Sequence, residues 1–257
     1  HFILFFPLLV IAHFLIAPKW RTFLLLAASY YFYMCWKAEY VILIIGSTVI
    51  DFYVAKKIHL STNKKSKKNW LIVSLLVNLS VLFLFKYFNF FAESFADAFT
   101  LLGNPIEASR LSIILPVGIS FYTFQTLSYS LDVYKGRIKP EHNFIAFLNY
   151  VSFFPQLVAG PIERATTFLP QFAQKKVFSY PQAVAGMRLI LYGFFKKMVI
   201  ADSIGLQVDA IYANAQDQNG ITLFVASALF FVQLYADFSA YTDIARGVGK
   251  LLGFELV

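Results

Sequence analysis

Residues 115–163 decide the fold of this chain, and they read LPVGISFYTFQTLSYSLDVYKGRIKPEHNFIAFLNYVSFFPQLVAGPIE. The first part is apolar enough for a membrane span, but it carries polar side chains where a simple anchor would have leucine or valine. These are Ser120, Tyr122, Gln125, Thr126, Ser128 and Tyr129. An unpaired polar group in hydrocarbon is costly, so these side chains are expected to face protein or a water-filled cavity. The stretch therefore predicts a membrane helix with an inward-facing polar side.

The second part of the stretch is an apolar run that is interrupted twice. Pro155 stands in the sequence FFPQ, and Gly160 is followed directly by Pro161. Proline and glycine at this spacing break a helix. Broken backbone at membrane depth is tolerated only where it lines a cavity or is buried in protein. We therefore predict that residues 143–160 form a re-entrant or interfacial element that enters and leaves the membrane on one side.

The composition places the whole chain in a membrane. Hydrophobic residues make up 59% of the 257 positions and charged residues 14%, and there are 30 phenylalanines and 15 tyrosines. The mean hydropathy is +0.64. A soluble core cannot absorb this much apolar surface, whereas large rings fill the gaps between tilted helices in a bundle. The predicted fold class is all-α, a polytopic transmembrane helix bundle with one re-entrant element.

The apolar runs predict seven spans in a single membrane domain over residues 1–257. The spans are placed at residues 2–17, 22–36, 40–55, 70–91, 111–134, 182–201 and 221–245. The first run is short for a span of about twenty residues. The chain also starts with His1 instead of Met and stops at Val257 without a polar tail, so we expect both ends to be cut.

Lysines set the predicted orientation. Six of them lie in Lys56–Asn69, whereas Ala92–Arg110 has three acids and one arginine. Cytoplasmic loops carry the excess of lysine and arginine. The first segment is therefore predicted to be a cytoplasmic loop and the second an outer loop. The acidic loop Asp202–Asn219 is then predicted to be outside, although Lys196 and Lys197 near the outer end of the preceding span do not fit this arrangement.

A second polar stripe lies on the last predicted span. Gln233, Asp237 and Tyr241 are four residues apart and share one helix face, and Asp243 lies about a third of a turn away. Carboxylates on a membrane helix suggest a functional site. For Asp243, an ion pair with Arg246 or Lys250 in the headgroup region is an equal alternative. For Asp237 we favour a buried structural or tunnel-lining role.

The remaining candidate sites are weak. The four histidines have no metal-site spacing, and the lone Cys35 cannot form an intrachain disulfide. His142 precedes the re-entrant element, but Pro140–Asn143 also has the pattern of a helix N-cap. The net charge of +8 comes largely from loops beside spans, where topology and anionic lipid account for it. No metal site and no nucleic-acid partner are predicted.

Three blocks of sequence resemble the membrane-bound O-acyltransferases, in particular the bacterial branch for alginate O-acetylation. The blocks are LPVGISFYTFQTLSYSLDVYKG at 115–136, FFPQLVAGPIER at 153–164 and YADFSAYTDIARGVGKLLGF at 235–254. The resemblance implies a multi-pass enzyme of the bacterial cytoplasmic (inner) membrane. Such an enzyme passes an acyl group, acetyl in the alginate branch, through a tunnel to an extracytoplasmic polysaccharide hydroxyl or a relay protein.

The same resemblance implies which molecules interact with the protein. It predicts no bound cofactor, an acyl donor such as acetyl-CoA or a carrier-protein thioester, surrounding lipid, a polysaccharide acceptor, and an extracytoplasmic acyltransferase or relay partner. The family's catalytic histidine follows the third block, so it is expected beyond Val257, and no catalytic residue is assigned among residues 1–257. The residues expected to line the tunnel or support it are Gln125, Tyr129, Pro155, Gly160, Pro161, Gln233, Asp237, Ser239, Tyr241 and Asp243.

Two other classes of function fit the same features. In a transporter or channel, polar helix faces and a broken segment would line a solute path, but such proteins usually contain repeated halves and no repeat is visible here. A non-catalytic membrane scaffold would need the polar residues only for packing.

Overall fold

The computed structural model describes residues 2–103, 106–107 and 110–257. All regular elements within these ranges are helices, which confirms the all-α prediction. The chain gathers into two compact units. The central unit comprises Leu25–Val158 and Arg164–Pro170, and the terminal unit comprises His1–Leu24, Ala159–Glu163 and Gln171–Val257. The predicted single membrane domain over residues 1–257 remains a prediction.

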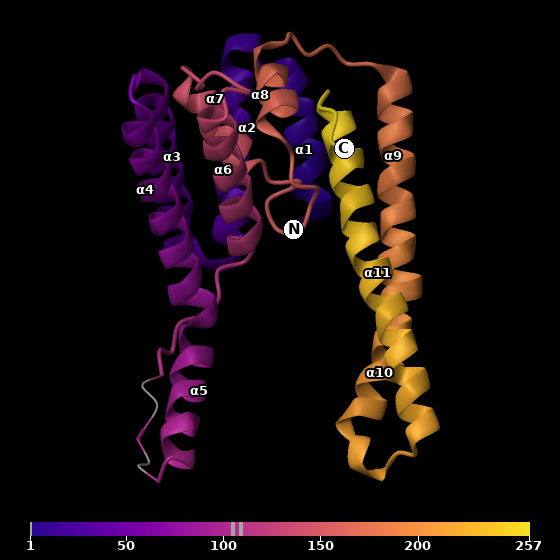
Figure 1. The fold of residues 1–257 in the computed structure, drawn as a ribbon. Helices are drawn as coiled ribbons and strands as arrows, with labels where there is room; N and C mark the ends of the chain where they lie inside the picture. The colour runs from indigo at the N-terminus through magenta and orange to yellow at the C-terminus, as the bar shows by residue number, and fades with distance from the viewer. Residues whose placement is uncertain (1, 104–105, 108–109) are drawn as a thin grey trace. The chain divides into compact units, whose positions relative to one another are not determined.

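The central unit is built mainly from five helices and the later part of α2 (Figure 1). Their bounds are α2 Pro18–Lys37, α3 Val41–Leu60, α4 Lys64–Leu82, α5 Phe88–Leu101, α6 Ile119–Tyr134 and α7 Phe144–Ser152. A 3₁₀ turn at Ala38–Tyr40 separates α2 from α3, and a π-helical segment at Phe83–Tyr87 joins α4 to α5. α3, α4 and α6 pack against one another, and α7 lies against α3 and α6.

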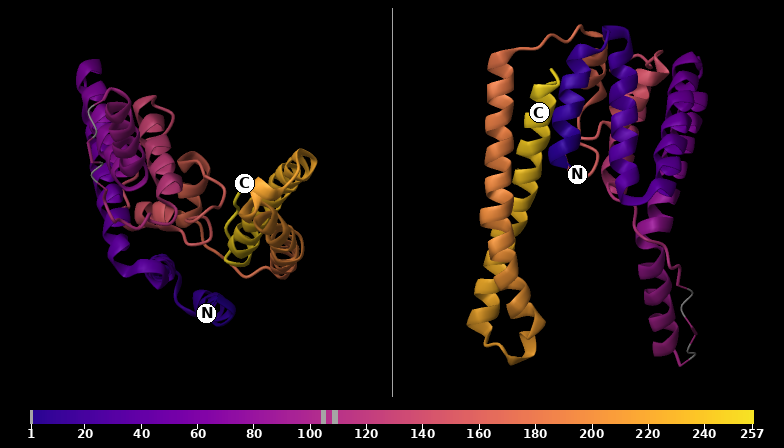
Figure 2. Two further views of the ribbon diagram at one scale, coloured as in Figure 1. Left: turned by 90° about the horizontal axis from the view of Figure 1, so that it is seen from below. Right: turned by 180° about the vertical axis from the view of Figure 1, so that it is seen from behind.

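The terminal unit contains α1, α9, α10 and α11. Their bounds are α1 Phe2–Leu15, α9 Tyr180–Phe195, α10 Asp202–Ala213 and α11 Gly220–Leu251, and α8, Ala165–Ala173, is shared between the two units. A second π-helical segment, Lys196–Ala201, connects α9 to α10 without a break. In both ribbon views the orange α9 and the yellow α11 run side by side (Figures 1 and 2).

Glycines allow α9 and α11 to approach closely. A Cβ atom on Gly186 would lie 2.7 Å from the carbonyl oxygen of Gly247, and one on Gly193 would lie 2.7 Å from that of Ala240. Small residues at such contacts let two helix backbones pack closely. In lipid, where the hydrophobic effect does not favour helix association, this close packing helps to hold helices together. The 32 residues of α11 rise about 48 Å, more than the ~30 Å hydrocarbon layer, so this helix extends beyond it.

Among the described residues, three helical stretches are long and apolar enough to cross a membrane. They are Pro18–Leu60, Lys64–Leu101 and Gly220–Leu251, and Leu4–Leu15 is a shorter apolar helix. The first stretch contains the break between α2 and α3, where Lys37 is extended at φ −154° and ψ 110°. Many large apolar side chains remain exposed on these helices, such as Ile42, Phe90, Phe224 and Phe231. This surface fits a bundle embedded in lipid.

Three predicted loop or span boundaries need correction. Most of Lys56–Asn69 is helical, because α3 continues to Leu60 and α4 starts at Lys64, with Asn63 as its N-cap. Ala92–Leu101 belongs to α5 and is not loop, whereas residues 104–105 and 108–109 of the predicted outer loop lie outside the described residues. The predicted acidic loop after Asp202 is largely α10. In each case the polar residues lie on exposed helix faces, which charge counting alone does not distinguish from loops.

The predicted span 111–134 also begins later than expected. α6 starts at Ile119, and residues 111–116 have no regular structure. Pro116 and the positive φ of Gly118 (+74°) prevent a helix from running through this point. Side chains of the central unit form hydrogen bonds with backbone groups of this non-helical stretch. Tyr33 and Tyr40 donate to the carbonyls of Val117 (3.1 Å) and Ile114 (2.6 Å), and the Asn89 carboxamide bonds both backbone groups of Leu111.

Candidate functional site

The broken segment after α7 is held by amide side chains. α7 ends where Phe153 leaves the helical region, at φ −56° and ψ 110°, so the carbonyl of Tyr150 has no helical partner. Gln125 and Gln156 both donate to this carbonyl, with Nε2–O distances of 2.7 and 2.9 Å. The N–H of Phe154 donates to Ser29 Oγ at 3.1 Å. Pro155 is buried beside these contacts. The break is therefore hydrogen-bonded inside protein, as its position in an apolar run requires.

α6 holds the other end of the same element. Tyr129 is fully buried, its hydroxyl accepts the N–H of Glu141 at 2.9 Å, and its ring packs on Phe147 with centroids 4.6 Å apart. Gln125 lies one turn earlier on α6 and is 4% exposed. The predicted polar face of α6 is thus buried against protein. Tyr129 binds the start of the 141–152 segment and Gln125 binds near its end. α7 has nine residues and rises about 14 Å, too little to cross a ~30 Å layer alone.

Gly118 is the point where α6 meets the broken segment. A Cβ atom at this position would lie 2.3 Å from the carbonyl oxygen of Leu157 and 3.3 Å from the Cα of Val158. Both neighbours are backbone atoms, which cannot rotate away. The start of α6 and the segment after Pro155 therefore pack backbone against backbone, and only glycine fits between them.

The second interruption belongs to the terminal unit. Gly160 is buried and Pro161 half-buried, and the following Glu163 is buried and accepts the N–H of Val257 at 2.6 Å. Burial raises the pKa of the Glu163 carboxyl, and the N–H of Val257 and the positive charge of Arg246 oppose that shift. A carboxylate that sequence reasoning did not select thus fixes this segment to the stretch that follows α11.

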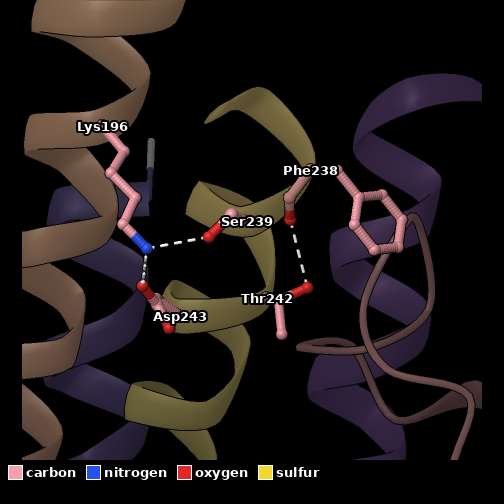
Figure 3. A network of polar contacts seen from close by, with 5 residues as sticks. All are labelled: Lys196, Phe238, Ser239, Thr242 and Asp243. Atoms are coloured by element: carbon pink, nitrogen blue, oxygen red, sulfur yellow. Dashed lines mark hydrogen bonds and ion pairs between the residues drawn. The ribbon is translucent and has the colours of Figure 1, made fainter. Parts of the chain in front are cut away.

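Ion pairs connect α11 to the π-helical segment after α9 (Figure 3). Lys196 Nζ lies 2.5 Å from Asp243 Oδ2 and 2.8 Å from Ser239 Oγ, and both partners are on α11. Lys197 Nζ lies 2.8 Å from Asp237 Oδ1 and 3.0 Å from Asp202 Oδ1. Charged groups on apolar helices are tolerated when they pair with one another. These contacts explain why two lysines can stand on a predicted span.

The π-helical segment has a direct part in this pairing. Adjacent residues of a regular α-helix point about 100° apart, so two consecutive lysines cannot normally reach one neighbouring helix equally well. Lys196 and Lys197 start the wider π turn, and both reach carboxylates of α11. π-bulges occur frequently at functional sites. Lys196 and Lys197 thus link the π-helical segment to acidic residues of α10 and α11.

The predicted stripe on α11 is arranged differently from the expectation. Asp237 is not buried, since its side chain is 52% exposed. Asp243 is 17% exposed and pairs with Lys196 and not with Arg246 or Lys250. Gln233 and Tyr241 are half-buried on the same helix. Gln125, Tyr129 and Pro155 come together in the central unit, whereas Gly160, Pro161 and the α11 residues belong to the terminal unit. Whether the two sets face one cavity stays a prediction.

Sequence reasoning missed a buried polar cluster in the central unit. Asp51 of α3 is 0% exposed and contacts Ser74 and Asn78 of α4 and Ser130 of α6. Its signal was present, because Asp51 is a single acid in the otherwise apolar run VILIIGSTVIDFYVA. We call Asp51, Ser74, Asn78, Thr126 and Ser130 the Asp51 cluster.

The described histidines, His13, His59 and His142, are dispersed and not grouped with other potential metal ligands. No group of three potential histidine, cysteine or acidic ligands occurs among the described residues. His13 on α1 is 1% exposed, and neither ring nitrogen has a hydrogen-bond partner. His142 is exposed, and the next residue, Asn143, caps α7 by accepting the N–H groups of Ile145 and Ala146. The N-cap interpretation of this sequence is therefore confirmed.

The end of α1 and the start of α2 form a basic region in the terminal unit. Arg21 donates to the carbonyls of Phe14, Ile16 and Lys176. The Lys176 ammonium lies 4.4 Å from the centroid of the Phe254 ring. Burial lowers the pKa of Lys176, and the Glu255 carboxylate opposes that shift. The start of α2 thus lies beside a loop that also carries positive charge.

Comparison with known proteins gives close relatives. The chain is 35% identical over 256 residues to the probable alginate O-acetylase AlgI of Pseudomonas aeruginosa, covering 99% of this chain and 48% of that protein. It is 35% identical over 268 residues to the peptidoglycan O-acetyltransferase of Helicobacter pylori, covering 93% and 49%. It is 27% identical over 150 residues to the teichoic acid D-alanyltransferase of Bacillus subtilis, covering 56% and 37%. No protein-family model matches. The chain spans about half the length of the curated relatives it matches.

Proposed function

We propose that this chain, which belongs to the membrane-bound O-acyltransferase family, is part of an enzyme that transfers an acyl group to a polysaccharide outside the cytoplasm. The observation that carries the proposal is the 35% identity over 99% of the chain to an alginate O-acetylase. Acetyl is the proposed group, because the relatives that match nearly the whole chain are named O-acetylases or O-acetyltransferases. The D-alanyltransferase matches a shorter part.

The proposed reaction is exchange of a thioester for an ester. The acceptor hydroxyl loses its proton and attacks the acyl carbonyl, the C–S bond breaks, and the proton ends on the released thiol. Acetyl-CoA or a carrier-protein thioester is the proposed donor, at the cytoplasmic face of the bacterial inner membrane. An extracytoplasmic relay protein is proposed as a partner where the polymer cannot reach the membrane. A histidine is the proposed general base, in keeping with the family, and residues 1–257 contribute other parts of the site.

The contribution of this chain is a fixed path for the acyl group. Where α7 breaks, Gln125 and Gln156 bind the carbonyl of Tyr150, and Ser29 binds the N–H of Phe154. Backbone of this kind at membrane depth belongs beside a cavity or inside protein. A path with rigid walls positions a reacting group and limits water access, and both effects favour acyl transfer over hydrolysis.

Deletion of the gene should remove ester-linked acetyl groups from an envelope polysaccharide. The measurement is acetate released by mild alkali from purified polymer fractions of wild-type, deletion and complemented strains. We expect loss in the deletion strain and return on complementation, because O-acetyl esters are base-labile whereas N-acetyl groups are retained. A transporter or a scaffold unrelated to acylation predicts equal ester content in all three strains. That result, in every polymer fraction, would contradict the proposed function.

A further inference from the structure

The Asp51 cluster holds a carboxylate that forms no ion pair with a described residue. Asp51 stands near the middle of α3, which has 20 residues and rises about 30 Å, so it lies far from both helix ends. It is 0% exposed, and the ion pairs found among the described residues do not include it. A buried charge is stable only when it is paired with an opposite charge or a metal, or neutralised.

Side-chain oxygens of α4 and α6 surround this carboxylate of α3. Ser74 Oγ of α4 lies 2.5 Å from Asp51 Oδ1 and 3.2 Å from Ser130 Oγ, which in turn lies 3.4 Å from Asp51 Oδ1. Thr126 Oγ1 of α6 lies 3.4 Å from Asn78 Oδ1. Asn78 Nδ2 lies 3.1 and 2.9 Å from the two carboxylate oxygens.

The cluster has more acceptor sites than hydrogens to fill them. Each hydroxyl has a single proton, and that of Thr126 also has the carbonyl of Thr123 at 3.0 Å as an acceptor. Asn78 Nδ2 also contacts the carbonyl of Ser74 at 3.0 Å. The Ser74 hydroxyl has two oxygens within reach and can donate to only one of them. The carboxylate is therefore met by neutral hydrogen-bond donors alone, with no cation among its contacts in the described residues.

We propose that the Asp51 cluster binds one Na⁺ ion. Oxygen ligands from a carboxylate and hydroxyls suit hard cations. The Asn78 carboxamide would add a further oxygen ligand only with its amide turned, because its nitrogen faces the carboxylate here. A single carboxylate balances a monovalent ion, whereas a divalent ion would leave net charge in the bundle. The oxygen separations of 2.5–3.4 Å require only a small opening to surround an ion with ligands near 2.4 Å, the distance for Ca²⁺, which is of similar size. A proton on Asp51 is the competing explanation, and the separate Na⁺ and pH dependence of the unfolding midpoint distinguishes the two.

Thermal unfolding of the purified full-length protein in nanodiscs tests this proposal. Choline chloride should be replaced stepwise by NaCl at constant ionic strength, with a parallel KCl series. We expect the unfolding midpoint to rise saturably, by about 3–5 °C at ten times the Kd, with Na⁺ more effective than K⁺. Equilibrium ²²Na⁺ binding should reach one ion per chain.

Three variants separate the ion from other causes. Asp51→Asn keeps the shape of the side chain and should lose both the Na⁺-dependent shift and ²²Na⁺ binding. Ser74→Ala should weaken the Na⁺ affinity about tenfold or more. Ser47→Ala is the control, because the Ser47 hydroxyl bonds the Ile44 carbonyl of its own helix. A midpoint that is equal in Na⁺ and choline, or that depends only on pH, would overturn the proposal, as would a full Na⁺ shift in Asp51→Asn.

Discussion

Gly118→Ala should remove most of the folded protein from the membrane. The alanine would have to adopt φ near +74°, and its Cβ would lie 2.3 Å from the carbonyl oxygen of Leu157. The first effect costs about 1–3 kcal/mol and the overpacking about 1–3 kcal/mol more. Their sum of roughly 2–6 kcal/mol is comparable to the total stability of many proteins, ~5–15 kcal/mol. The measurement is the monodisperse fraction in fluorescence-detected size-exclusion chromatography, with the thermal midpoint of what remains.

Two other glycines serve as matched controls for this prediction. Gly136 has φ +70° but nothing within 4 Å of a built Cβ, so Gly136→Ala reports the backbone strain without the clash. Gly46 lies in α3 with open space around it, and Gly46→Ala should be neutral or stabilising. We expect the losses to rank Gly118, then Gly136, then Gly46. If Gly118→Ala behaves like Gly136→Ala, the close contact with Leu157 does not exist in the folded protein.

Lys196→Met should destabilise the terminal unit by about 2–4 kcal/mol, and a second substitution should restore most of the loss. Removing one partner of a buried ion pair costs roughly 3–5 kcal/mol, because the other charge stays behind without a partner. We expect a smaller loss of unfolding free energy in Lys196→Met, because the Lys196 and Asp243 side chains are 30% and 17% exposed and water screens their charges in part. In Lys196→Met/Asp243→Leu both charges are gone, and the apolar pair should be stable beside lipid.

The double-mutant cycle gives this prediction its measurement. Unfolding of the four proteins in detergent should yield a coupling energy above ~1.5 kcal/mol between positions 196 and 243. The comparison pair is Lys37 and Glu39, which are 3.5 Å apart with side chains 34% and 77% exposed. Its coupling should stay below ~0.5 kcal/mol. A double variant that is as unstable as Lys196→Met alone would mean that Lys196 acts through something other than Asp243.

Much of the fold could be predicted because lipid restricts what a sequence can do. Apolar length alone places α1, α2, α3 and α11 within a few residues of the predicted runs, and Pro155 locates the end of α7. The burial of polar side chains on α6 could also be predicted, because polar residues in an apolar run, such as Gln125 and Tyr129, are unfavourable on a face that contacts lipid. The Asn143 cap of α7 was visible in the sequence as well.

The details that were missed depend on residues far apart in the chain. The start of α6 is displaced because Tyr33, Tyr40 and Asn89 bind the backbone of residues 111–117, and no local pattern reports such partners. The pairing of Lys196 with Asp243 requires the α9–α11 contact and a π turn, neither of which periodicity reveals. Asp51 was passed over because a single acid in an apolar run carries no information about the hydroxyls that surround it.

Sided acyl transfer in sealed membrane vesicles tests the central claim most directly. Inverted vesicles expose the cytoplasmic face, and they should be given radiolabelled acetyl-CoA with cytosolic extract, which can load carrier proteins. We predict base-labile label in polymer protected inside the vesicles, dependent on the gene and several-fold lower with Gln125→Leu at equal protein level. Phe231→Ala, at an exposed position, should retain full transfer. Equal labelling with and without the gene, or labelling confined to the donor side, would contradict the account.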